Sequence, residues 1–368
     1  MKKAAYNIIV AGGGTGGHLF PGIAVAQALR GKNPENRILF LGTDRPVEKD
    51  IISRAGFPHR SVRAEGLKGR RRMQQLRSLG KILPGIRESL GIFRSFPPDL
   101  LIGMGSYAAA APLLAARMKG IKIMLHEQNR MAGLTNRVLS LWADRICVSF
   151  PLPQQKGFPA HVFPRMRMTG NPVREEILRE KDRGTVKGGT PFRVLITGGS
   201  QGAHRINTAV EESLSYLKNK NAFCFVHQSG AADEASVRKM YSDAGISATV
   251  RAFFHDMAAQ YRDADLLICR AGATSVAEIC ALGKAAVYIP FPCAADDHQT
   301  HNARALAEAG AAAMIPEKKL QGGKLAEIME YYASHPGERE RMAARARKFG
   351  NSNAAKQLAE MAYSLLEK

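Results

Sequence analysis

A glycine run that ends in a histidine, Gly12-Gly13-Gly14-Thr15-Gly16-Gly17-His18, has the residue types for chemistry on a phosphate. It follows the apolar residues 8–10 and precedes a segment with helical spacing. A strand that turns through glycines into a helix gathers backbone N–H groups and the positive end of the helix at one point, which suits an anion. His18 at the edge of this turn adds a group that can take part in chemistry as well as binding.

The same glycines also fit a dinucleotide-binding fingerprint. Gly12-x-Gly14-x-x-Gly17 has the required spacing, and Asp44 after the next apolar run would be the acidic residue that binds a ribose. This alternative, an NAD-linked oxidoreductase, leaves the motifs of the second half of the chain unexplained. A protein that only binds anionic surfaces is a further alternative, based on the net charge alone.

Two turns in the second half of the chain carry polar groups of the same kind. Gly198-Gly199-Ser200-Gln201-Gly202 follows one apolar run, and residues 270–278 follow another. Ser275 and Glu278 have the spacing of a capping box, in which Glu278 would only close the start of a helix. Alternatively, the turn holds a nucleotide and Glu278 binds the two hydroxyls of its ribose, because a carboxylate accepts two hydrogen bonds at once.

A polar segment follows at Asp296-Asp297-His298-Gln299-Thr300-His301-Asn302. Two aspartates and two histidines in so short a stretch suggest a metal site, but their spacing matches no zinc pattern. The interleaved amides Gln299 and Asn302 favour hydrogen bonds to sugar hydroxyls instead. We therefore expect no metal and no cofactor.

Alternating strands and helices are expected to position these residues. Such alternation predicts doubly wound parallel sheets, in which ligands lie beyond the carboxyl ends of the strands. The sequence predicts an α/β protein of two Rossmann-like domains facing a central cleft, joined near residues 151–190, with the helical stretch 338–368 returning to the first domain. The expected strands are 7–11, 37–41, 60–62, 100–103, 121–125, 145–149, 192–197, 222–226, 249–253, 266–269, 285–289 and 313–315.

The chain of 368 residues has a formal net charge of +21, which indicates an anionic partner. Trp142 is the only tryptophan, and no basic strand carries interleaved aromatic residues, so we expect no nucleic acid. The five cysteines lack paired spacing, which indicates buried thiols in a reducing cytosol. No apolar stretch is long enough to span a membrane.

Residues 68–94 combine basic side chains with an apolar stripe at helical spacing, with a break expected at Pro84 and Gly85. An ordinary helix pair with a solvated basic face explains this composition. A basic amphipathic segment that touches anionic lipid explains it equally well.

Taken together, the motifs resemble those of the MurG family of peptidoglycan glycosyltransferases, over about residues 7–310. The motifs that carry the resemblance occur in this order: 12–18, Gly103-Met104-Gly105-Ser106-Tyr107, His126-Glu127-Gln128-Asn129, Gly170-Asn171-Pro172-Val173-Arg174, Gly198-Gly199-Ser200-Gln201-Gly202-Ala203, Arg270-Ala271-Gly272-Ala273-Thr274-Ser275 and Asp296-Asp297-His298-Gln299.

The resemblance implies a two-domain glycosyltransferase of the GT-B type. It would move N-acetylglucosamine (GlcNAc) from UDP-GlcNAc to the 4-hydroxyl of undecaprenyl-diphospho-MurNAc-pentapeptide with inversion, forming lipid II. Residues 1–168 with about 346–368 would meet the acceptor and the membrane, and residues 169–345 would bind UDP-GlcNAc. The enzyme would lie on the cytoplasmic face of the inner membrane, as a peripheral protein on its anionic surface. Another GT-B transferase with a different sugar or acceptor remains an alternative.

The resemblance also implies roles for individual residues. Phe254 would lie at the uracil, where the family has Ile, with Glu278 at the ribose and Ser200 at the diphosphate. The glycine turns after Ala11 and Ile102 would face the acceptor diphosphate. Further substrate-binding positions are Thr15, Gly16, Gly17, Tyr107, Asn129, Arg174, Ala273, Thr274, Ser275, Val276, Ala277 and Gln299.

An inverting transfer needs a base that takes the acceptor proton, most often a histidine or a carboxylate. His18 is the first candidate, although it could instead only orient the acceptor. Glu127 is the second candidate, and His126 and Glu127 could equally brace the site. Arg174 and backbone N–H groups would stabilise the leaving diphosphate.

Overall fold

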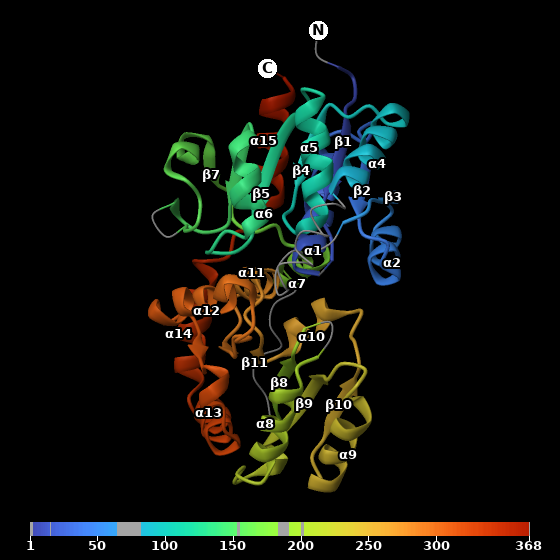
Figure 1. Ribbon diagram of the computed structural model, residues 1–368. Helices are drawn as coiled ribbons and strands as arrows, with labels where there is room; N and C mark the ends of the chain where they lie inside the picture. Colours follow the sequence, from blue (N-terminus) through green and yellow to red (C-terminus); the bar gives the residue numbers. More distant parts are fainter. Residues whose placement is uncertain are drawn as a thin grey trace. The chain divides into compact units, whose positions relative to one another are not determined.

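The structure, a computed structural model, describes residues 3–14, 16–64, 82–152, 155–182, 191–199 and 202–367. The chain forms two compact units (Figure 1). Unit 1 comprises Met1–Arg174 and Ser352–Lys368, and unit 2 comprises Glu175–Asn351. Both boundaries between the units lie six residues later than the sequence predicts: the first follows residue 174 rather than 168, and the second follows residue 351 rather than 345.

Unit 1 is built on a parallel sheet in the order β3-β2-β1-β4-β5-β6-β7. The order turns outward in both directions from β1 and β4, and ligands bind beyond the carboxyl ends of strands at such a point. The strands are β1 (Asn7–Ala11), β2 (Arg37–Gly42), β3 (His59–Ser61), β4 (Leu100–Gly103), β5 (Lys122–Glu127), β6 (Arg145–Val148) and β7 (Met166–Met168).

Helices cover both faces of this sheet. Because side chains alternate along a strand, Ile8 and Val10 of β1 join one core with α1 and α15, and Ile9 joins the opposite core with α4, α5 and α6. The helical segments are α1 (Gly16–Lys32), α2 (Pro46–Arg54), α4 (Ile82–Ser95), α5 (Ala110–Met118), α6 (Leu134–Leu139) and α15 (Ala354–Leu366), with 3₁₀ turns at Tyr107–Ala109, Ser140–Trp142 and Ala160–Arg165.

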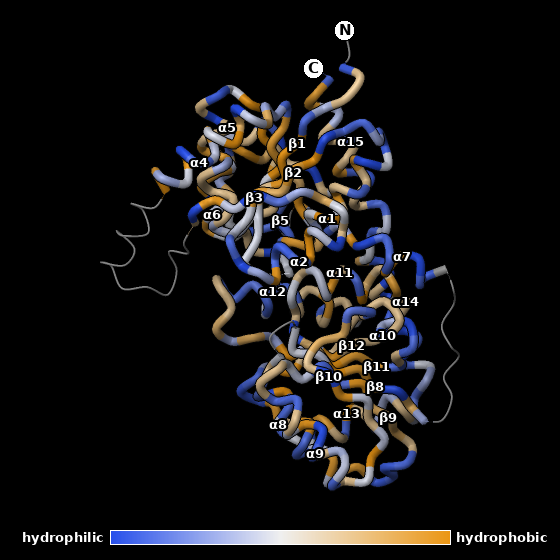
Figure 2. The backbone as a smooth tube through the Cα atoms, turned by 90° about the vertical axis from the view of Figure 1, so that its right-hand side faces the viewer, coloured by the Kyte–Doolittle hydropathy of each residue, from blue (hydrophilic) through white to orange (hydrophobic). Residues whose placement is uncertain are grey.

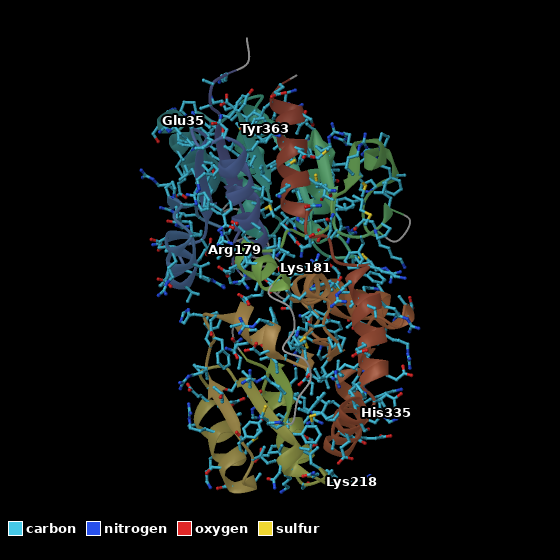
Figure 3. The ribbon with its side chains drawn as sticks, turned by 180° about the vertical axis from the view of Figure 1, so that it is seen from behind. Glu35, Arg179, Lys181, Lys218, His335 and Tyr363 are labelled. Atoms are coloured by element: carbon cyan, nitrogen blue, oxygen red, sulfur yellow. The ribbon has the colours of Figure 1, made fainter. Side chains whose placement is uncertain are left out.

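The last helix, α15, completes unit 1 from the far end of the chain (red in Figure 1). Leu358 and Leu365 are buried beside α1 and β1. Tyr363, labelled in Figure 3, accepts a hydrogen bond of 2.8 Å from Asn36 Nδ2, and its ring meets that of Tyr6 edge-on. The expected return of the C-terminal helical stretch to the first domain is confirmed for α15, whereas residues 338–351 belong to unit 2.

Unit 2 repeats the same plan with the parallel order β10-β9-β8-β11-β12-β13. Its strands are largely hydrophobic (orange in Figure 2) and lie in one core with the helices. The elements are α7 (Glu175–Asp182), β8 (Phe192–Thr197), α8 (His204–Leu214), β9 (Phe223–Gln228), α9 (Glu234–Ala244), β10 (Ala248–Arg251), α10 (Met257–Asp263), β11 (Leu266–Cys269), α11 (Ala273–Leu282), β12 (Ala286–Tyr288), α12 (His298–Glu308), β13 (Ala313–Met314), α13 (Gly322–Ser334) and α14 (Pro336–Arg347), with 3₁₀ turns at Lys220–Ala222, Ala295–Asp297 and Glu317–Lys319.

The predicted α/β class with two doubly wound sheets is confirmed, and each expected strand is present within a few residues of its predicted bounds. The sequence analysis missed β7, which has only three residues, of which Arg167 and Met168 are exposed. The break expected at Pro84 and Gly85 is wrong, because α4 runs through both. Pro84 falls in the first turn, where a backbone N–H has no helical partner to lose.

The structure bears on two sequence-based expectations about membranes, the basic amphipathic segment 68–94 and the lack of a spanning helix. Of the basic segment 68–94, residues 68–81 lie outside the described residues. Helix α4 therefore represents this segment alone in the structure. Across the described ranges, no helix is long and apolar enough to cross a bilayer.

Leu358→Ala should lower the free energy of unfolding of unit 1 by about 2–5 kcal/mol, because it leaves a cavity in the core beside α1. Chemical denaturation followed by circular dichroism would measure the loss. Glu360→Ala, an exposed position on the same helix, is the matched control. Equal stability of the two variants would contradict the packing described for α15.

Candidate active site

Three loops meet beyond the carboxyl ends of β1, β4 and β5. A Cβ placed on Gly12 would lie 3.0 Å from the Cβ of Met104, and one on Gly14 would lie 3.4 Å from the hydroxyl of Tyr107. Gly105 has a φ of +82°, and a Cβ there would lie 3.2 Å from Nδ1 of His18. The two glycine turns of unit 1 are therefore in direct contact, and Gly105 is needed both for its backbone conformation and for space.

His18 is held by the backbone carbonyl of Met104. Its Nδ1 lies 2.9 Å from the oxygen of Met104. Because a carbonyl only accepts, Nδ1 carries the proton and Nε2 is the ring's acceptor. Burial lowers the pKa of His18, although the hydrogen bonds with Met104 and Gln128 oppose this effect. A neutral imidazole with Nε2 unprotonated is the form that a general base requires.

Glu127 is buried at the end of β5 and accepts hydrogen bonds from its own loop. Oε1 accepts from the N–H and the Nδ2 of Asn129, and Oε2 accepts from the N–H of Gly133 and the Nδ2 of Asn136. Burial raises the pKa of Glu127, and these donors oppose the shift. With both oxygens occupied, the geometry favours the bracing alternative over the role of a base.

Two neighbouring side chains, His126 on β5 and Gln128 directly after it, add two more links. Gln128 Nε2 donates to the oxygen of Met104 at 2.8 Å, so that one carbonyl holds both Gln128 and His18. His126 Nε2 donates to the oxygen of Gly170 at 3.1 Å, which connects β5 to the segment before Arg174. Burial lowers the pKa of His126 to about 4.

The remaining predicted residues of unit 1 lie around the start of α1. Gly16 and Gly17 begin this helix, and the guanidinium of Arg174 lies 4.2 Å from the ring centre of Phe20 on its next turn. A Cβ on Gly16 would lie 2.9 Å from the same ring. Arg174 and the glycine run are therefore neighbours, whereas Thr15 lies outside the described residues.

In unit 2, a buried amide links the second glycine turn to Phe254. Gln228 Nε2 donates to the oxygen of Gly199 at 2.9 Å, and its Oε1 accepts from the N–H of Phe254 at 2.9 Å. The N–H of Phe254 is therefore already hydrogen-bonded within unit 2. Ser200 lies outside the described residues.

Helix α11 presents its first turn at the carboxyl end of β11. Gly272 is the N-cap, and Ala273 and Thr274 are the first helical residues. The capping-box alternative for Ser275 and Glu278 is therefore wrong, since the helix has already begun before Ser275. Ser275 and Ala277 are partly exposed, whereas Val276 and Glu278 are buried.

The polar segment after β12 is braced by its amides. Gln299 Oε1 accepts from the N–H of Phe291 at 3.0 Å, and Asn302 Nδ2 donates to the oxygen of Ala271 at 3.2 Å. Asn302 thereby ties this segment to the turn before α11. Within the described ranges, no three His, Cys, Asp or Glu side chains gather as a metal site would need.

Sequence reasoning named Gln128 only within the motif at residues 126–129 and gave it no role, and it did not single out Gln228. Their positions immediately after, or at the end of, a predicted strand are the available signal. However, their partners are backbone atoms of other loops, which no spacing rule identifies.

Two parallel sheets with glycine turns at their carboxyl ends agree with the family models that match this chain. The Glycosyltransferase family 28 N-terminal domain matches residues 8–148, and the Glycosyltransferase family 28 C-terminal domain matches residues 193–358. The class is therefore a two-domain glycosyltransferase of the GT-B type.

Relatives of similar length show which family of glycosyltransferases this chain belongs to. The chain is 46% identical over 360 residues, 98% of both chains, to the UDP-N-acetylglucosamine--N-acetylmuramyl-(pentapeptide) pyrophosphoryl-undecaprenol N-acetylglucosamine transferase of Syntrophus aciditrophicus (strain SB). It is 44% identical, over 95% of both chains, to the protein of the same name from Geotalea uraniireducens (strain Rf4). The crystal structure of Acinetobacter baumannii MurG matches with a TM-score of 0.76 at 30% identity, covering 98% of this chain and 99% of that one. The chain belongs to the MurG family.

His126 makes the stability of unit 1 depend on pH. Its folded pKa of about 4 lies below the ordinary value of 6.5, so the unfolded state binds more protons as the pH falls through this window. The free energy of unfolding attributable to His126 should therefore fall by about 2 kcal/mol between pH 7 and pH 5.

Denaturant titrations at both pH values would measure this loss, which His126→Gln should remove. His161→Gln, at an exposed position of unit 1, is the control. A pH dependence that is the same in wild type and His126→Gln would contradict the assignment.

Proposed function

We propose that this chain transfers GlcNAc from UDP-GlcNAc to the 4-hydroxyl of undecaprenyl-diphospho-MurNAc-pentapeptide, with inversion at the anomeric carbon, and so makes lipid II for peptidoglycan synthesis. The observation that carries the proposal is the 46% identity, over 98% of both chains, to a relative whose name states this transfer. The placement of every described motif residue near the carboxyl end of a strand or the start of a helix supports it.

In this proposal unit 2 binds the donor. The carbonyl of Phe254 accepts the N–H of uracil, because its own N–H already donates to Gln228. A backbone contact also explains why the exchange of Ile for Phe is tolerated there. Glu278 binds the ribose hydroxyls, Gln299 contacts the sugar, and the first turn of α11 with Ser200 binds the diphosphate.

Unit 1 binds the acceptor and supplies the base. Nε2 of His18 takes the proton of the 4-hydroxyl while that oxygen bonds to the anomeric carbon of GlcNAc. The bond from this carbon to UDP breaks at the same time, and the diphosphate leaves with the electron pair. Arg174 and the backbone N–H groups of the glycine run stabilise the negative charge that develops.

The lipid tail of this acceptor requires contact with a membrane, which we propose to be the anionic cytoplasmic surface of the inner membrane. Helices α4, α5 and α6 cover one face of the unit 1 sheet. On them Leu83 and Met118 are each 67% exposed, and Leu134 is 49% exposed. Exposed cations, including Arg87 and Arg94, lie on α4. Apolar side chains flanked by cations suit the boundary of an anionic leaflet.

The transfer can be tested with labelled UDP-GlcNAc and a short-chain analogue of the lipid acceptor. Wild type should transfer GlcNAc. His18→Ala should reduce kcat about 10²- to 10⁴-fold, which is the usual contribution of a general base. Glu278→Ala should mainly raise the donor KM. Because burial lowers the pKa of His18, the acidic limb of the wild-type pH profile should lie below pH 6.5.

Each outcome of this assay has a separate meaning. If folded wild type binds UDP-GlcNAc but transfers nothing, the proposed lipid-linked acceptor is wrong. Failure to bind UDP-GlcNAc would reject the whole proposal. A wild-type pH profile retained in His18→Ala would reject His18 as the base.

The membrane contact can be tested by sedimentation with phosphatidylglycerol vesicles. Arg87→Glu with Arg94→Glu should weaken binding at least tenfold, and Leu83→Ser with Leu134→Ser should weaken it further, because the first pair supplies charge and the second apolar area. Lys218→Glu with Lys239→Glu, a charge-matched pair of exposed residues in unit 2, is the control. Equal losses in both charge-reversed pairs would mean that net charge, not this surface, governs binding.

A further inference from the structure

A buried carboxylate outside the predicted site binds the backbone of the first glycine run. Glu48, in the first turn of α2, is 4% exposed. Its Oε2 accepts the N–H of Gly14 at 2.9 Å and the hydroxyl of Thr43 at 2.8 Å. Its Oε1 accepts the N–H of Thr43 at 2.8 Å. Each oxygen therefore faces at least one donor, and one of these donors belongs to the glycine run.

The same helix start also binds the other backbone group of Gly14. Arg45 Nη1 donates to the oxygen of Gly14 at 2.8 Å. Gly14 has a φ of +83°, a conformation that only glycine adopts without strain. Residues 45 and 48 therefore hold both hydrogen-bonding groups of a peptide segment that has little conformational preference of its own.

The positions around this carboxylate have no room for any residue larger than glycine. A Cβ on Gly13 would lie 2.2 Å from Oε1 of Glu48, and one on Gly42, at the end of β2, would lie 1.7 Å from the same atom. Gly13, in the turn after β1, and Gly42, at the end of β2, thus make the space that Glu48 fills. This arrangement explains why the turn needs a glycine at 13, whose φ is not positive.

The surroundings of Glu48 favour its charged form. Burial raises the pKa of Glu48, but the nearby imidazole of His59 and the hydrogen bonds from Gly14 and Thr43 outweigh burial, and the pKa lies below its ordinary value. Nε2 of His59 on β3 lies 3.7 Å from Oε1. An ionised carboxylate is acceptor-only and binds N–H groups more strongly than a neutral amide does.

We propose that Glu48 is a positioning residue for the transfer: it fixes the backbone of Gly13 and Gly14, so that the N–H groups of the glycine run face the acceptor diphosphate and His18 faces the acceptor hydroxyl. This inference rests on the proposed function. Glu48 acts through Gly14 and touches no substrate. Asp44, which the dinucleotide alternative needed, is exposed and pairs instead with Lys49.

Glu48→Gln tests the inference with almost no change of volume. One of its two terminal atoms becomes an NH₂ group that faces a donor, either Gly14 N–H or Thr43 N–H, so one hydrogen bond must be lost. We expect the Gly14 amide proton to exchange with solvent at least tenfold faster, measured by NMR. We expect kcat/KM for the lipid acceptor analogue to fall at least tenfold, whereas the Kd for UDP-GlcNAc stays within twofold.

Two further variants make the result specific. Asp50→Asn makes the same chemical change on α2, at an exposed carboxylate that pairs with Arg54, and should leave both readouts unchanged. Arg45→Gln, at an exposed position, removes the bond to the Gly14 oxygen without opening the core, and should raise the exchange rate and lower kcat/KM by a smaller factor. Arg45→Gln decides the question if Glu48→Gln proves unfolded by circular dichroism.

The outcomes separate this inference from the proposed function. Wild type without transfer rejects the proposed function, and Gly14 exchange then still reports the contact. Active wild type together with a folded Glu48→Gln variant whose kcat/KM is unchanged overturns the positioning role. A lower kcat/KM with unchanged exchange at Gly14 also overturns it, because the effect would then not pass through the glycine run.

Discussion

One backbone carbonyl, that of Met104, connects the three loops from which the site of unit 1 is made. It follows β4 and accepts hydrogen bonds from His18, which follows β1, and from Gln128, which follows β5. This is possible only because β1, β4 and β5 are adjacent parallel strands whose carboxyl ends share one edge. The tautomer of His18, and therefore the availability of Nε2 as a base, depends on the same carbonyl. The topology of the sheet thus determines the chemistry of one imidazole.

Unit 2 uses the same device as unit 1, with a different partner. Gln228 ends β9 and donates to the oxygen of Gly199 in the turn after β8, as Gln128 after β5 donates to the turn after β4. In both units a buried amide fixes a neighbouring loop that has little stiffness of its own. Burying such groups costs free energy unless they are paired, so these pairs specify one loop conformation. Rigid loops position a diphosphate without reorganisation during the reaction.

Most of the architecture could be predicted from sequence, because buried parallel strands appear as short apolar runs and glycine-rich turns mark where those runs end. The expected strands at residues 7–11, 100–103, 192–197 and 266–269 coincide with β1, β4, β8 and β11. β7 gave no such signal, since it is short and half exposed. For Ser275 and Glu278, spacing alone suggested a cap, but the helix starts earlier, at Ala273. Local patterns locate an element without fixing its first residue.

The site was predicted as a set of motifs, and the interactions between those motifs could not be. Glu127 was a candidate base by its residue type, yet its four donors from residues 129, 133 and 136 favour the bracing alternative. No role was predicted for Glu48, Gln128 or Gln228, because each binds a backbone atom far away in sequence, and backbone atoms leave no trace in composition. The same reasoning explains the division of labour. The predicted substrate-binding residues occur in recognisable runs, whereas residues that hold those runs in place are single polar side chains buried behind them. A carboxylate behind a glycine turn therefore deserves the same mechanistic scrutiny as the histidine in front of it.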